Sequence, residues 1–435
     1  MISIRRNIAD EVQMSEKKTI LVIADHPLAP SGVGTQTRYF IETLIKTGKY
    51  RFICLGGAIK HPNYDPQYIT DDRWGEKDFV VYPVDGYGSP EVIRSILWTE
   101  RPDLLWFMTD PRFYPWLWQI ENEVRPLVPM VYYHVWDNYP PPKFNAKWYN
   151  STDVIASISK VTYDIVNKVA PEVENHYIPH AVNNDVFRKV DQESVNQFIK
   201  DSFPDHNGRT VFFWNNRNAR RKHSGTLINW FNKFAKEVGP ENVCLIMHTD
   251  PKDPNGQDLH QLIEDLDMTD GRIVLSTKKL PPEALSMMYN MADCTINISD
   301  AEGFGLATLE SLSCGTPIIV NMTGGLQEQV TDGENWFGIG IEPSAKALIG
   351  SQTVPYIYED RVSEEDFLAA LRTFYDMSLE EREKLGELGM KHVKENYNYE
   401  NFQKRWLDLV EDICQRLGSW DTRSGYQPWK IKEVS

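Results

Sequence analysis

The chain has 435 residues, and this length predicts two domains because a single hydrophobic core rarely grows so large. Its 41% hydrophobic and 12% aromatic residues are typical of a globular protein and exclude a disordered one. The net charge of −16 argues against a broad basic surface for nucleic acid or anionic lipid. No apolar run approaches the roughly 20 residues that span a bilayer, so no transmembrane segment is expected.

Two further features concern the compartment. Residues 1–7 lack the apolar core of a secretory signal, and the five cysteines show no Cys-x-x-Cys spacing. Scattered free thiols are typical of a reducing compartment, so we expect a cytoplasmic protein. No set of Cys and His residues has the spacing of a metal site, and we expect no metal.

Strands and helices alternate through the first part of the chain. Runs rich in β-branched and aromatic residues predict strands at 19–24, 52–55, 79–82, 104–107, 130–133 and 154–158. Helical periodicity predicts helices at 37–47, 90–100 and 160–169. A loop that carries Gly32 and Gly34 joins the first strand to the first helix. This alternation predicts a parallel sheet with helices on both faces.

A second series of the same kind follows residue 181. Its predicted strands lie at 210–214, 242–247, 272–275, 295–299 and 317–321, and residues 363–417 are mainly helical. We therefore predict an α/β fold with domains at 1–181 and 182–415, and a tail at 416–435 that packs on the N-terminal domain. Gly32-Val33-Gly34 lacks the third glycine of a dinucleotide fingerprint, which disfavours an NAD enzyme.

The most informative segment is 300–310, in which Glu302 and Glu310 flank a Gly303-Phe304-Gly305 turn. A predicted strand precedes it and a predicted helix, 306–314, follows it. Ligands of open α/β sheets bind where a strand ends and a helix begins, and the first amides of a helix attract phosphate. The other interpretation is a tight βα turn with two solvated glutamates.

A basic run follows the first strand of the second series. Arg217 and Lys222 lie five residues apart on a strand-to-helix loop, so both can point toward one site. Two cations and a helix N-terminus could together neutralise a phosphate group. The other interpretation is a solvated basic patch of Arg217, Arg220, Arg221 and Lys222. Arg220 and Arg221 could equally be helix-surface residues.

These residues resemble the family 4 (group 1) glycosyltransferases of the GT-B fold. The glutamate pair is similar to the E-x7-E motif of that family, and Arg217 to Lys222 resembles its G-R-x-x-x-x-K loop. Further resemblances, in the expected order, are the hinge at 178–187, the Y-x-x-A-D helix end at 289–293 and the G-G-x-x-E stretch at 324–328. Departures are Asn216 for glycine, His180-Ala181 for Asn-Gly, and His223-Ser224 after Lys222.

The resemblance implies two Rossmann-like, doubly wound domains that face a cleft, with C-terminal helices crossing back to the N-terminal domain. The domain at 1–181 would lie on the acceptor side, and the domain at 182–415 would bind the nucleotide sugar. It further implies donor contacts from Gly303, Phe304, Gly305 and Leu306.

Individual roles are also implied by the resemblance. Glu310 would bind the ribose hydroxyls, and Glu302 would contact the donor sugar, either as a binding group or as a catalytic carboxylate. Arg217 and Lys222 would bind the diphosphate and act in catalysis. Gly32 and Gly34 would close on the donor phosphates, unless they form an ordinary βα turn. His134 would lie near the transferred sugar, with Asp137 as the second candidate, unless it is a buried structural histidine.

Two other patterns are weaker evidence for function. Asp265-Leu266-Asp267 has the D-x-D spacing of metal-dependent glycosyltransferases, but it lies in an amphipathic helix whose acids predict a solvated face. Six of the thirteen tryptophans fall between Trp98 and Trp148, where aromatic faces could form an acceptor platform beside the loop at 139–142.

The expected enzyme is a retaining, metal-independent hexosyl- or pentosyltransferase. It would need no cofactor and would take a UDP- or GDP-linked sugar as co-substrate, with a glycan as the acceptor. The remaining alternatives are a hydroxylated base in DNA or a protein side chain as acceptor, a sugar-nucleotide epimerase of the GT-B fold, and an inactive sugar-nucleotide-binding scaffold.

Overall fold

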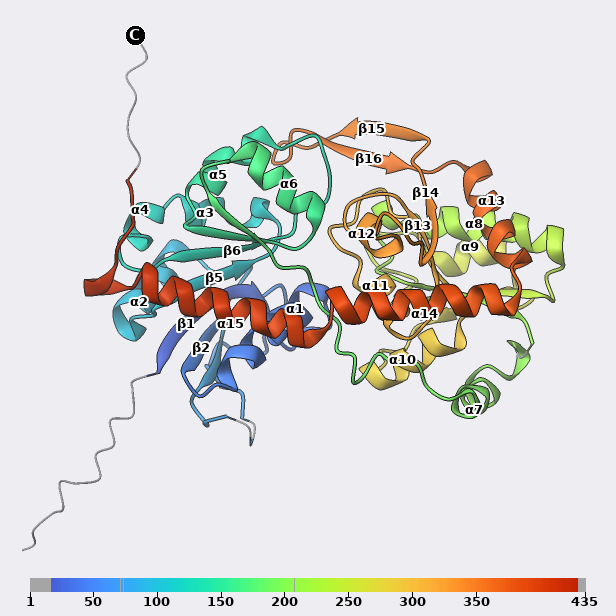
Figure 1. Ribbon diagram of the computed structural model, residues 1–435, viewed down its shortest axis with the longest axis horizontal. Coiled ribbons are helices and arrows are strands. Elements are labelled where there is room, and N and C mark those ends of the chain that lie inside the picture. The colour runs from blue at the N-terminus through green and yellow to red at the C-terminus, as the bar shows by residue number, and fades with distance from the viewer. Residues whose placement is uncertain (1–16, 71, 73, 207, 429–435) are drawn as a thin grey trace, which may run out of the picture. The chain divides into compact units, whose positions relative to one another are not determined.

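The computed structural model describes residues 17–70, 72, 74–206 and 208–428 (Figure 1). Contacts divide the chain into two compact units. The first holds the chain up to Tyr133, Ser151–Val154 and the segment from Arg405, and the second holds His134–Asn150 and Ile155–Lys404. The domain boundary at residue 181 stays a prediction. Residues 1–7, inspected above for a secretory signal, lie outside the described part.

The first sheet has eight strands in the order β3-β4-β2-β1-β5-β6-β7-β8. Strand β1 pairs in parallel with β2 and β5, and β3 pairs antiparallel with β4. The central strands are buried along nearly their whole length, as expected for a parallel sheet covered on both faces. The strands are β1 (Lys18–Asp25), β2 (Tyr50–Gly57), β3 (Gln67–Tyr68), β4 (Phe79–Pro83), β5 (Leu104–Met108), β6 (Met130–His134), β7 (Val154–Ser157) and β8 (Glu174–Tyr177).

The second sheet has six parallel strands in the order β11-β10-β9-β12-β13-β14. Its core joins Phe212 of β9 to Phe231 of α8 and Phe374 of α13, so both helices pack on one face of this sheet. The strands are β9 (Thr210–Asn215), β10 (Val243–His248), β11 (Ile273–Ser276), β12 (Cys294–Asn297), β13 (Ile318–Asn321) and β14 (Gly338–Ile341).

The helices begin at side-chain caps that the sequence provides. Ser89 caps α2 ahead of Pro90, and Ser378 and Glu381 form a capping box on α14. The helices are α1 (Gly32–Ile45), α2 (Pro90–Glu100), α3 (Pro115–Trp118), α4 (Glu121–Val124), α5 (Ala146–Asn150), α6 (Lys160–Val169), α7 (Gln192–Ser202), α8 (Ser224–Val238), α9 (Leu259–Asp265), α10 (Pro282–Met291), α11 (Leu306–Ser313), α12 (Leu326–Val330), α13 (Glu364–Asp376), α14 (Leu379–Asn396) and α15 (Tyr399–Arg416).

Helix α15 returns the chain to the first unit. Its residues from Arg405 onward belong to that unit, where the ring of Trp406 packs edge-on against Phe40, Trp106 and Tyr133. The following tail contributes Trp420, whose indole Nε1 donates to Pro102 O at 2.9 Å. Trp429 of the tail lies outside the described residues.

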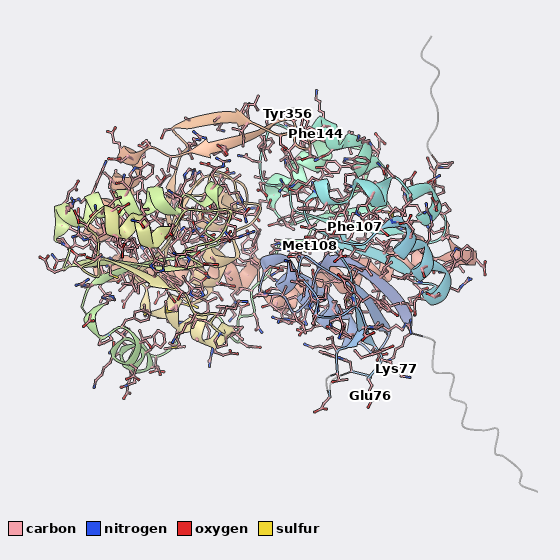
Figure 2. All side chains as sticks on the ribbon, turned by 180° about the vertical axis from the view of Figure 1, so that it is seen from behind. Glu76, Lys77, Phe107, Met108, Phe144 and Tyr356 are labelled. Carbon is pink, nitrogen blue, oxygen red and sulfur yellow. The ribbon has the colours of Figure 1, made fainter. Side chains whose placement is uncertain are left out.

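An antiparallel hairpin projects from the second unit (Figure 1). Strands β15 (Ala345–Ile349) and β16 (Ile357–Arg361) form it, and the sequence did not predict either strand. Tyr358 N donates to Tyr139 O at 2.7 Å, and the ring of Tyr356 meets that of Phe144 edge-on, with 5.0 Å between their centroids. Figure 2 labels these two side chains. The hairpin thus packs on the loop that follows β6.

Most predicted elements lie within a residue or two of the observed ones, and helix α1 differs most. It begins at Gly32 rather than Thr37, because Ser31 caps it through a 3.0 Å bond from Gly34 N. Gly32 and Gly34 therefore lie in the first helical turn and not in a loop. Within the described residues, no helix is both long enough and apolar enough to cross a membrane.

Candidate functional site

The loop between β12 and α11 carries Glu302, and Glu310 follows within α11, in the strand-loop-helix context that the sequence predicts. Backbone bonds from two later segments hold it: Asp360 N donates to Asp300 O at 2.9 Å, and Gly325 N donates to Glu302 O at 3.0 Å. A Cβ on Gly324, whose φ is 49°, would lie 1.8 Å from Glu302 O. Only glycine fits that position, so the Gly324–Gly325 turn fixes the backbone of Glu302.

Glu302 and Lys222 form a buried ion pair. Their side chains are 13% and 8% exposed, and Lys222 ends a 3₁₀ turn (η4, Arg220–Lys222) after β9. Burial opposes the ionisation of Glu302, but the charges of Lys222 and Arg221 outweigh it and lower the pKa of Glu302. Burial and the neighbouring Arg221 lower the pKa of Lys222 to about 8, despite the attraction of Glu302. A carboxylate and an ammonium thus meet just before a helix start.

Arg221 is a second cation beside Glu302. Its Nη1 lies 3.9 Å from Glu302 Oε2 and also donates to Ala301 O. Arg221 is not among the site residues that the sequence predicts, and its place beside Lys222 was the available signal.

Asp137, the second candidate after His134, also belongs to this neighbourhood. A Cβ on Gly303 would lie 3.1 Å from Asp137 Oδ1, and the Asp137 charge favours the charged form of Lys222. Acidic and basic side chains from three segments therefore converge on Glu302.

Arg217 engages a different carboxylate. Its Nε and Nη2 donate to Asp253 at 2.6 and 3.2 Å, and its side chain is 63% exposed. The bond from Arg217 lowers the pKa of Asp253 to about 2. The structure thus pairs Arg217 with the loop after β10 and Lys222 with Glu302. That both cations serve one diphosphate stays a prediction.

Glu310 lies in the second turn of α11 and is oriented by two side chains. Tyr289 Oη donates to Glu310 Oε2 at 2.7 Å, and Asn215 Nδ2 donates to Tyr289 Oη at 2.8 Å. Burial raises the pKa of Glu310 to about 7, although the bond from Tyr289 acts in the opposite direction. The Glu310 carboxyl group therefore changes charge near neutral pH.

The first turn of α11 offers its backbone amides to a ligand. Gly305, with φ 95°, is the N-cap and provides no side-chain cap to the turn that Leu306 begins. Amides of this kind are the usual anion donors at helix starts. Phe304 is buried, and its ring meets that of His180 edge-on with 5.3 Å between the centroids. This packing holds the Gly303–Gly305 turn in place.

His134 is completely buried at the end of β6. Its Nε2 lies 2.6 Å from Tyr149 Oη, and burial lowers its pKa to about 3. This geometry is typical of a packed core histidine, and a catalytic role for His134 stays a prediction.

Gly34 makes the first βα turn possible in the other unit. A Cβ there would lie 2.7 Å from Ala29 O and 2.9 Å from His26 O. Gly34 is thus required by the turn itself, whatever it binds. A role for Gly32 and Gly34 in binding phosphate stays a prediction.

The metal-like spacing at Asp265 and Asp267 belongs to the end of α9. Both residues are exposed, and Asp265 accepts a bond from Gln261 Nε2 at 2.8 Å within the same helix. Within the described residues, no group of three or more His, Cys, Asp or Glu side chains could hold a metal ion.

The parallel sheets and the glutamate loop at a helix start define an α/β protein with a candidate ligand site at the carboxyl ends of its strands. Solved structures with this architecture are GT-B glycosyltransferases. Sucrose-phosphate synthase (tll1590) from Thermosynechococcus elongatus superposes with a TM-score of 0.72 at 15% identity, covering 92% of this chain and 100% of that one. Alr3699/HepE from Anabaena, solved with UDP-glucose, gives 0.66 at 15% identity, covering 91% and 100%. The GT-B fold prediction is confirmed.

Residues 195–391 match the family described as glycosyl transferases group 1. A D-inositol 3-phosphate glycosyltransferase of Acidothermus cellulolyticus is 42% identical over 77 residues, which are 18% of this chain and 17% of that protein. A probable sucrose-phosphate synthase of Thermosipho melanesiensis is 27% identical over 250 residues, 56% of this chain and 49% of that protein. The chain thus spans less than half the length of either relative.

Proposed function

We propose that the chain is a retaining, metal-independent glycosyltransferase, which moves a sugar from a nucleoside-diphosphate sugar to a hydroxyl acceptor in the cytoplasm. The observation that carries the proposal is the buried Lys222–Glu302 pair beside the uncapped first turn of α11. A buried ammonium and helix amides without a side-chain cap are suited to take up the charge of a departing diphosphate.

Each side chain then has a distinct task. Lys222, supported by Arg221, faces the diphosphate, and Arg217 can add a second charge if it leaves or shares Asp253. Glu302 accepts hydrogen bonds from the donor sugar. Glu310, when ionised, accepts from the two ribose hydroxyls, since a carboxylate has two acceptor oxygens for a diol. The proposal gives Glu302 a binding role and not that of a covalent nucleophile.

UDP-linked hexoses are the first donors to test. The Anabaena structure named above holds UDP-glucose, which supports a uridine donor. A GDP-linked donor is the second candidate, since a GDP-mannose-dependent mannosyltransferase of Mycolicibacterium smegmatis is 25% identical over 193 residues, which cover 42% of this chain and 48% of that protein. For the acceptor, we propose a glycan, while a DNA base or a protein side chain are outcomes of the same screen.

The test uses the full chain with UDP-glucose or GDP-mannose, an acceptor panel and EDTA, with products followed by NMR. We expect transfer with retained anomeric configuration, and a loss of about 100-fold or more in kcat for Lys222→Met, as for other groups that stabilise developing charge. Lys233→Met, which removes an exposed lysine paired with Glu364, is the matched control and should keep full activity.

Three results would contradict parts of the proposal. A product with inverted anomeric configuration would exclude a retaining reaction. Loss of activity in EDTA would exclude metal independence. Full activity of Lys222→Met would show that Lys222 and Glu302 do not form the donor site. Donor turnover without any acceptor would favour an epimerase. Binding without turnover of every donor would favour an inactive scaffold.

A further inference from the structure

A cavity of about 1040 Å³ lies in the first unit, away from the carboxyl ends of its strands. Lys18 begins β1, Tyr50 begins β2, and Asp103 directly precedes β5, and all three line this cavity. These strands run in parallel, so the cavity lies at their amino ends. Ligands of open α/β sheets bind at the opposite edge. The cavity is therefore separate from any site at that edge.

The cavity wall is more basic than the chain as a whole. Five cations and three carboxylates line it, in a protein whose net charge is −16. The lining charges are Lys17, Lys18, Lys49, Arg51 and Arg101 against Glu100, Asp103 and Glu411. A local excess of positive charge in an acidic protein favours an anionic ligand.

Lys18 and Arg101 are not held in close ion pairs with the carboxylates of the cavity wall. Lys18 Nζ lies 3.8 Å from Asp103 Oδ1, and that carboxyl group already accepts bonds from Thr19 N at 2.9 Å and Ser419 Oγ at 2.8 Å. Arg101 places its guanidinium over the ring of Trp420, 4.1 Å from the centroid. By contrast, Lys49 and Glu411 form a 2.8 Å pair.

The tail supplies a fixed aromatic wall. The backbone N of Trp420 donates to Leu127 O at 2.6 Å, and its indole Nε1 donates to Pro102 O at 2.9 Å, so both the backbone and the ring of Trp420 are held. An aromatic face of this kind packs against the carbon face of a sugar ring, while nearby carboxylates accept from hydroxyls. The tail thereby completes a site that the sheet edge alone would leave open.

We propose that this cavity binds a phosphorylated sugar, with the phosphate at Lys18 and Arg101 and the sugar ring against Trp420. The site goes beyond the proposed transferase function, because none of its lining residues belongs to the glutamate loop.

Isothermal titration calorimetry of the full chain with glucose 6-phosphate tests the proposal, with glucose as the uncharged comparison. The wild type should bind glucose 6-phosphate and not glucose. Arg101→Gln should weaken binding by about tenfold, the scale of a charge-assisted hydrogen bond, and Lys18→Gln with Arg101→Gln should weaken it further. Arg101 is exposed, so the single variant should fold, which its melting temperature will show.

Two controls make the result decisive. Arg94→Gln removes an arginine from α2, the helix that Arg101 directly follows, where it pairs with Glu123 outside the cavity, and should leave the affinity unchanged. Arg217→Gln, in the proposed donor site, should also leave it unchanged. Failure of the wild type to bind, equal weakening in Arg94→Gln, or weakening confined to Arg217→Gln would each overturn the proposal. None of these outcomes depends on transferase activity.

Discussion

Replacing Lys222 with methionine should lower the free energy of unfolding by about 3 kcal/mol. Removing one partner of a buried pair costs about 3–5 kcal/mol, because the other charge stays buried. Here Arg221 Nη1 at 3.9 Å and Asn297 Nδ2 at 3.5 Å still face Glu302 Oε2, which places the value at the lower end. The folded pKa of Glu302 is lowered, so its contribution is present above the unfolded glutamate pKa and is lost as pH falls. The difference in unfolding free energy between the wild type and Lys222→Met should therefore be largest near neutral pH.

The assay is urea denaturation followed by tryptophan fluorescence, in which buried Trp214 reports on the second unit. A double-mutant cycle with Glu302→Gln should give a coupling energy of about 2 kcal/mol, because the partners are in contact. Lys233→Met, from the half-exposed pair with Glu364, should cost less than about 1 kcal/mol. Equal losses for Lys222→Met and Lys233→Met, or strictly additive effects in the cycle, would refute the reasoning.

Four further predictions concern the same site. Donor affinity, measured by calorimetry across pH, should rise as pH increases through about 7, because Glu310 ionises there. Tyr289→Phe removes the bond that lowers the pKa of Glu310, so it should move the midpoint of this rise to higher pH. An unchanged midpoint would contradict the assignment of the pH dependence to Glu310. Because the folded pKa of Glu310 is raised, its contribution to stability should fall over the interval from the unfolded carboxyl pKa to about 7. Gly324→Ala should destabilise by more than about 2 kcal/mol in urea, whereas Gly333→Ala, with positive φ but open space, should cost only about 1 kcal/mol; equal costs would exclude the clash. Arg217→Gln should weaken donor binding by about tenfold, the scale of a charge-assisted hydrogen bond. Unchanged donor affinity would show that Arg217 does not contact the donor.

Local patterns in the sequence were enough for much of the fold. Helices α2 and α6 begin and end where the helical periodicity predicts, and the structure shows that Ser89 and Ser159 cap them. Helix α1 was placed too late, because glycine is a poor helix former and Gly32 and Gly34 therefore indicated a loop. The β15–β16 hairpin escaped prediction because its strands are largely half-exposed and lack clear alternation.

The site was predictable only as far as it is local. The glutamate loop follows from one continuous segment, whereas the partners of its charges come from distant ones. Lys222 is 80 residues from Glu302, and Asp253 is 36 residues from Arg217. No periodicity encodes such pairs, and their choice depends on how the loops of one sheet edge converge. Arg221 was therefore passed over although it stands beside Lys222.

The bond from Asp360 N to Asp300 O has a consequence for synthesis. The loop that bears Glu302 emerges from the ribosome well before the hairpin strand that supports it. Until residue 360 is translated, the carbonyl of Asp300 has no such donor, and the side chain of Asn321 lacks its acceptor at Asp360 O. Maturation of the glutamate loop therefore waits for a segment about 60 residues downstream.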